Sequence, residues 1–118
     1  MSGDCFEVAA GLVIHDNENK YVLVHGTVLS TTRGGTAPIG YRHAHAWVEY
    51  ESTFEHESWP QPIVVATCVD KANGNDVELP AALYYKVGHV QVTGRYARWK
   101  AIEMMAQTGN YGPWKEGE

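Results

Sequence analysis

The segment from Tyr41 to Tyr50 alternates strictly between two kinds of side chain. Successive side chains of an extended strand point to opposite faces, so one face here would be small and apolar. The opposite face would carry polar and aromatic side chains, namely His43, His45, Trp47 and Glu49. A period of two fits a strand and does not fit a helix. The chain must therefore fold around a β-sheet.

The side chains of residues 4–15 instead follow the periodicity of a helix. The polar or small residues in this stretch are spaced three, four and four apart, which places them on one helical stripe: Asp4, Glu7, Gly11 and His15. Further strands are expected over 21–27 and 63–70, short strands near 76–78 and 89–92, and helices over 81–87 and 93–108. These elements predict an α+β fold with an N-terminal helix, a mostly antiparallel sheet of about four strands and two C-terminal helices.

The helix expected over 93–108 has the longest helical pattern in the chain. Its apolar stripe would consist of Tyr96, Trp99, Ile102 and Met105, and Gly109 would cap its C-terminus. Polar clusters at 16–19 and 72–75 predict turns, and the glycine-containing segment Leu29–Gly40 predicts a loop.

Composition limits the classes of protein to which this chain can belong. At 118 residues it is long enough for one domain with a hydrophobic core and too short for two. The formal net charge of −5 argues against nucleic-acid binding, because a surface that follows phosphates needs an excess of basic residues. No apolar run approaches the ~20 residues that span a membrane, and the N-terminus lacks the basic start of a signal peptide. We therefore expect a cytoplasmic protein whose two cysteines are free thiols.

Cys5 is the candidate nucleophile. It stands where the helix over 4–15 begins, and a helix N-terminus presents unpaired N–H groups and a partial positive charge. Both stabilise a thiolate and lower the pKa of the thiol, and the N–H groups could also bind an oxyanion. A cysteine near a terminus can equally be a small buried apolar residue. Cys68, in the middle of the strand over 63–70, is explained by packing alone.

His45 and Asp70 could complete a catalytic triad. His45 lies in the alternating strand and would act as the base, although His43 is on the same face and could replace it. Asp70 ends the strand over 63–70, where its carboxylate could orient the imidazole. Asn73, in the turn that follows, could take the orienting role instead. Each of these residues also fits an ordinary structural role, in packing or in a turn.

Four segments in order carry a family resemblance: Gly3-Asp4-Cys5-x-Glu7, Val22-Leu23-Val24-His25-Gly26, His45-Ala46-Trp47-Val48-Glu49 and Val69-Asp70. In this order they resemble the transglutaminase-like superfamily of papain-fold cysteine enzymes. The resemblance covers residues 3–73 and leaves a C-terminal helical part over 74–118. The whole chain is also similar to short proteins of phages and mobile gene cassettes.

The resemblance implies thiol-dependent acyl transfer or hydrolysis on an amide or ester, without a cofactor. Cys5 would be the nucleophile, His45 the general base and Asp70 the residue that orients it. Trp47, His43 and Asn73 would line the substrate cleft, which the loop Leu29–Gly40 would border. The expected partner is a small-molecule or peptide acyl substrate, with no role for nucleic acid or a membrane.

Two other classes of function fit the sequence. His43, His45 and Glu49 share one strand face and could bind a metal, with zinc the best match, completed by His25, His56 or His89. Alternatively, the protein could be an inert binding module or a homodimer that uses exposed aromatic residues, Trp59, Tyr111 and Trp114.

Overall fold

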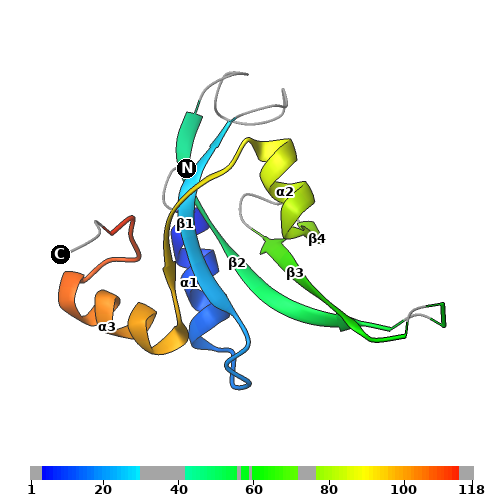
Figure 1. The fold of residues 1–118 in the computed structure, drawn as a ribbon. Coiled ribbons are helices and arrows are strands. Elements are labelled where there is room, and N and C mark those ends of the chain that lie inside the picture. The colour runs from blue at the N-terminus through cyan, green and yellow to red at the C-terminus, as the bar shows by residue number, and fades with distance from the viewer. Residues whose placement is uncertain (1–3, 30–41, 56, 59, 72–76, 115–118) are drawn as a thin grey trace.

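The computed structural model describes residues 4–29, 42–55, 57–58, 60–71 and 77–114. In chain order, its elements are α1 (Asp4–Ile14), β1 (Val22–Leu29), β2 (Arg42–Phe54), β3 (Ile63–Asp70), β4 (Val77–Pro80), α2 (Ala81–Gly88), β5 (Gln91–Tyr96) and α3 (Arg98–Thr108). The predicted α+β fold is confirmed, with five strands in one sheet rather than about four (Figure 1). Among the described residues, no helix is both long enough and apolar enough to cross a membrane.

The sheet is antiparallel throughout, in the order β4-β3-β2-β1-β5. Each of its faces is covered by a separate hydrophobic cluster. The first cluster joins α1 and α3 to the sheet through residues such as Phe6, Val13, Leu23, Val48 and Met104. The second packs α2 on the other face and comprises Val24, Trp47, Cys68 and Ala81. The alternation in β2 therefore does separate two faces, as the sequence predicts.

The ladder between β2 and β3 does not run the whole length of β2. It begins at Phe54↔Ile63 and ends at Val48↔Val69, and β3 itself ends one residue later at Asp70. β2 continues past that point to Arg42, paired with β1. Figure 1 shows the other ends of β2 and β3 extending away from the helices as a long hairpin. The result is an edge of β2, near Ala46, that β3 leaves open.

The expected helix over 93–108 is wrong in its first turn. Residues up to Tyr96 belong to β5, which pairs with β1, and α3 begins only at Arg98. The free edge of β1 offers backbone partners to this β-branched segment, and such tertiary pairing overrides a local helical pattern. The helix ends at Thr108, and Gly109 caps it in a left-handed conformation with φ of 73°, as predicted.

The predicted apolar stripe of α3 is correct only in part, because Met105 packs against the first cluster but Trp99 and Ile102 are exposed. Trp99 is 65% exposed and Ile102 is 40% exposed, whereas Ala101 and Met104 are buried against α1 and the sheet. A strict spacing of three drifts around a helix that has 3.6 residues per turn, so it does not mark one buried face. Trp114, expected at the surface, is buried in the first cluster. Trp59 lies outside the described residues, and Tyr111 is exposed as expected.

Asp16 organises the turn between α1 and β1. Its carboxylate accepts hydrogen bonds from the backbone N–H groups of Glu18 (3.2 Å), Lys20 (2.6 Å) and Tyr21 (2.7 Å). The turn predicted at 16–19 is thereby confirmed, and its geometry sends β1 back along α1.

Candidate active site

Cys5 is the second residue of α1 rather than the first, and its side chain is only 5% exposed. Its N–H is among the first four of the helix, which have no partner within the helix. The Cys5 thiol lies close enough to the His45 ring and to the backbone N–H of Ala46 for both to lower its pKa. This contact is possible because β3 has ended, so that the first turn of α1 reaches the open edge of β2.

His45 lies between the thiol and a carboxylate. Its Nε2–H donates a hydrogen bond of 2.7 Å to Oδ2 of Asp70, and both side chains are buried. Since Nε2 is occupied by Asp70, Nδ1 is the ring nitrogen that remains for the Cys5 thiol. The indole of Trp47 stacks on the imidazole, with ring centroids 6.1 Å apart. The three residues predicted as a triad are thus brought together in the predicted order, by α1, β2 and β3.

The pKa of each partner follows from these contacts. Burial raises the pKa of the Cys5 thiol, but the hydrogen bond and positive charge of His45 and the N–H of Ala46 together lower it below the ordinary 9.0. Burial lowers the pKa of His45, but hydrogen bonds and negative charge from Asp70 and Cys5 raise it to about 9. A thiol with a lowered pKa beside an imidazole with a raised pKa favours a thiolate–imidazolium pair.

Tyr84 of α2 also touches this group, although the sequence analysis did not identify it. Its hydroxyl donates a hydrogen bond of 2.9 Å to Oδ2 of Asp70, the oxygen that also binds His45. No local pattern links residue 84 to residue 70. The contact arises because β4 returns along β3 and places α2 over the end of that strand.

A second buried carboxylate, Glu49, lies on the same face of the sheet. Its Oε1 accepts from Arg95 Nη1 at 2.5 Å, and its Oε2 accepts from Trp47 Nε1 at 3.0 Å and from the hydroxyl of Tyr85. The Cys68 thiol is 3.6 Å from Oε2 of the same carboxylate. Burial and the charge of Glu49 raise the pKa of the Cys68 thiol, so this cysteine is held protonated.

The arrangement does not form the alternative metal site. Glu49 is engaged by Arg95 and Tyr85, and His45 is engaged by Asp70. Within the part of the chain that the structure describes, no three His, Cys, Asp or Glu side chains are grouped so as to hold a metal ion. The His43 ring lies 6.1 Å from the His45 ring, centroid to centroid, yet it is His45 that contacts Asp70 and Cys5.

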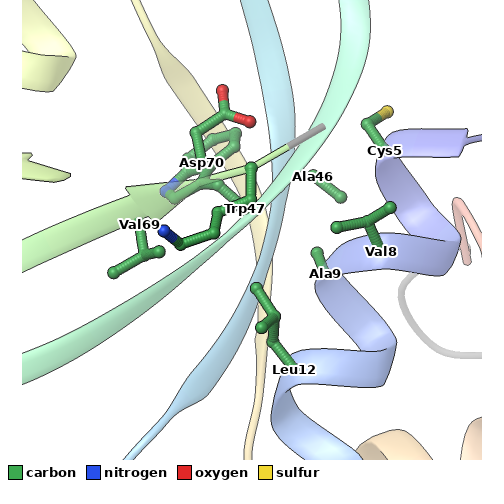
Figure 2. A pocket seen from close by; sticks show the side chains of 9 residues that line it. Cys5, Val8, Ala9, Leu12, Ala46, Trp47, Val69 and Asp70 are labelled. Atoms are coloured by element: carbon green, nitrogen blue, oxygen red, sulfur yellow. The ribbon is translucent and has the colours of Figure 1, made fainter. Parts of the chain in front are cut away.

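A narrow pocket opens between α1 and the ends of the strands, with an empty volume of about 150 Å³ that includes open solvent. Its lining residues are Cys5, Val8, Ala9, Leu12, Ala46, Trp47, Val69, Asp70 and Lys71. Figure 2 shows the sulfur of Cys5 at the first turn of α1, with Asp70 and Trp47 across from the helix. Trp47 lines this pocket, and His43 is not among the described lining residues. Asn73 and residues 30–40 of the predicted bordering loop lie outside the described residues.

Comparison of the chain with protein-family models, with curated proteins and with solved structures finds no match in any of the three.

Proposed function

We propose that this protein is a cysteine-dependent enzyme that transfers or hydrolyses an acyl group from an amide or an ester. The observation that carries the proposal is the position of His45, which lies beside the Cys5 thiol on one side and is hydrogen-bonded to Asp70 on the other. A nucleophile, a base in contact with it and a group that orients the base are the parts that thiol catalysis requires. The same order on helix, strand and strand end supports a transglutaminase-like fold.

In the acylation step, the Cys5 thiolate attacks the substrate carbonyl carbon. A C–S bond forms, and the electron pair of the carbonyl π bond moves to the oxygen. When the tetrahedral intermediate collapses, the bond to the leaving amine or alcohol breaks and His45 gives its proton to that group. The product is a thioester on Cys5.

In the second step, water or an amine attacks this thioester and passes a proton to His45. The C–S bond breaks, and the sulfur leaves as the thiolate that began the cycle. Asp70 orients His45 and stabilises its imidazolium form, which is present before acylation and forms again when water or the amine gives up its proton. The N–H groups at the start of α1, which a helix leaves without partners, would stabilise the oxyanion.

The narrow pocket supports a small acyl group as the transferred part. The hollow leaves almost no enclosed space beside Cys5, far below the roughly 300–1,000 Å³ pockets that drug-sized ligands occupy. We propose a small-molecule ester or amide, or a single side chain of a peptide, as the substrate. Two free thiols suit a reducing compartment, so we also propose that the enzyme acts in the cytoplasm.

The test is to trap the thioester with an activated ester. We expect p-nitrophenyl acetate to leave one acetyl group on Cys5 and none on Cys68, as read by peptide mass spectrometry. The rate should fall at least about tenfold in His45→Gln, because the thiolate then lacks its counter-charge. Cys68→Ala serves as the matched control and should acetylate as the wild type does. Absence of acetyl-Cys5, or an equal rate in His45→Gln, would overturn the proposal.

A further inference from the structure

We propose that Tyr84 is a positioning residue of this site, which holds Asp70 in the orientation that His45 needs. The inference rests on the proposed function and extends the triad to α2, an element that supplies none of its three members. Tyr84 does not contact Cys5 in any described hydrogen bond and acts through Asp70.

The first route from Tyr84 to the triad is a hydrogen bond. Oδ2 of Asp70 accepts from the Tyr84 hydroxyl at 2.9 Å and from His45 Nε2 at 2.7 Å. Two donors that converge on one carboxylate oxygen restrict rotation of the carboxylate about its bond to Cβ. A fixed carboxylate in turn fixes the imidazole, because the direction of the Nε2–H bond follows the acceptor.

The second route is aromatic packing. The ring of Tyr84 lies on Trp47, with centroids 5.4 Å apart, and Trp47 stacks on His45. Tyr84 therefore supports the imidazole both through its acceptor and through the indole that covers it. Replacing Tyr84 by phenylalanine keeps the ring and removes only the hydroxyl, so the two routes can be separated.

The chain provides a matched control in the next residue. Tyr85 also projects from α2 and donates its hydroxyl to a buried carboxylate, but that carboxylate is Glu49. Arg95 bonds to both Glu49 and the Tyr85 hydroxyl, so this second cluster has its own charge partner. Tyr85→Phe thus removes a similar hydroxyl from the same helix and leaves the bonds at Asp70 in place.

Loss of the Tyr84 hydroxyl should change the pKa of the Cys5 thiol in one direction. If Asp70 turns away, the imidazolium is held less well and its hydrogen bond to Cys5 is formed for a smaller fraction of the time. The thiol then loses part of the interaction that lowers its pKa, while its burial still acts to raise that pKa. Tyr84→Phe should therefore shift thiolate formation to higher pH.

The experiment measures the rate of Cys5 alkylation by iodoacetamide as a function of pH, in a Cys68→Ala background. We expect Tyr84→Phe to react about three- to tenfold more slowly than the background near neutral pH, and to reach the same plateau at high pH. Tyr85→Phe should stay within about twofold of the background at every pH. Thiolate ultraviolet absorbance, taken as a difference against Cys5→Ser, gives the same midpoint without requiring reagent to enter the site.

The outcomes separate the two proposals. Equal profiles for Tyr84→Phe and Tyr85→Phe, or a lowered midpoint in Tyr84→Phe, would overturn the role of Tyr84 while the triad stands. If the background protein itself shows an ordinary thiol midpoint that His45→Gln does not change, the proposed function fails and the Tyr84 inference fails with it. Melting temperatures of the two phenylalanine variants show whether a slower alkylation reflects only a loss of stability. A purely structural role would lower the melting temperature without moving the midpoint of thiolate formation.

Discussion

His45 and His25 are both buried histidines of this sheet, and their surroundings give them opposite charge preferences. His45 faces a carboxylate and a thiol, which raise its pKa to about 9 against the effect of burial. His25 is 1% exposed and is surrounded by the rings of Phe6, Tyr96 and Trp114. Burial lowers its pKa to about 4, and neither ring nitrogen has a hydrogen-bond partner among the described residues. Only the first of these histidines is equipped for proton transfer.

The depressed pKa of His25 predicts sensitivity to acid. In the unfolded chain the pKa of His25 is near 6.5. As pH falls from about 6.5 toward 4, the unfolded state therefore binds a proton at His25 that the folded state does not bind. The contribution to stability is therefore present above pH 6.5 and lost toward pH 4. Between pH 7 and pH 5 the loss is about 2 kcal/mol.

His25→Leu should remove this acid-dependent loss, because leucine does not titrate. The measurement is the free energy of unfolding by urea at the two pH values, in wild type and variant. The drop on going to pH 5 should be smaller in the variant by about 2 kcal/mol. An identical drop in both proteins would show that His25 is not a neutral buried residue.

At the scale of elements, the sequence predicts those helices and strands that a local pattern determines. It does not predict those that depend on pairing between distant segments of the chain. The helix at 4–15, the strand at 63–70 and the two faces of β2 are correct because the periodicity of the side chains fixes them locally. The start of α3 is wrong because β1, about 70 residues earlier, draws residues 91–96 into the sheet.

The residues of the candidate site also fall into those that a local pattern predicts and those that depend on distant pairing. Cys5, His45 and Asp70 each stand at a recognisable end or face of an element, so their types and order could be read from the chain. Tyr84 could not, because its contact with Asp70 depends on how β4 returns along β3 and sets the position of α2.

Alanine substitutions at two glycines, one in β1 and one in α1, should have opposite effects on stability. A Cβ at Gly26 in β1 would lie 2.5 Å from the carbonyl oxygen of Gln91 and 2.8 Å from the Trp47 ring. Gly26→Ala should therefore force β5 and Trp47 to shift, at a cost of about 1–3 kcal/mol. Gly11 in α1 has no other atom within 4 Å of such a Cβ, so Gly11→Ala should stabilise the helix by about 0.5–1 kcal/mol.

Urea unfolding curves and tryptophan fluorescence test both glycine variants. The emission of Trp47 should change in Gly26→Ala and stay unchanged in Gly11→Ala. Gly26→Ala of wild-type stability would mean that Trp47 does not lie against β1 as described.

At the scale of the whole molecule, the last described segment closes the core. Trp114 packs on His25 and Tyr96, with ring centroids 4.9 and 5.0 Å away, and its Nε1–H donates to Oδ1 of Asn110 at 3.0 Å. The segment thereby covers the face of β1 that is opposite to the face covered by α2. Each face of the sheet carries one buried cluster, and the site lies where α1, β2 and β3 meet.

Trp114→Ala should consequently destabilise the protein by about 3 kcal/mol, since it leaves a large cavity over β1. Trp99 offers the matched control, because it is 65% exposed on α3. Trp99→Ala should cost less than about 1 kcal/mol. Thermal unfolding compares them directly, and equal losses would contradict the position of Trp114.

The most direct measurement of the central claim is the order in which Cys5 and His45 lose their protons. Nuclear magnetic resonance can follow the imidazole nitrogens of His45 and the Cβ carbon of Cys5 during one pH titration of the folded protein. The account predicts that the thiol titrates first, below its ordinary 9.0, and that the imidazole holds its proton until about pH 9. If the imidazole loses its proton first and leaves a neutral thiol beside it, Cys5 and His45 are not a catalytic pair.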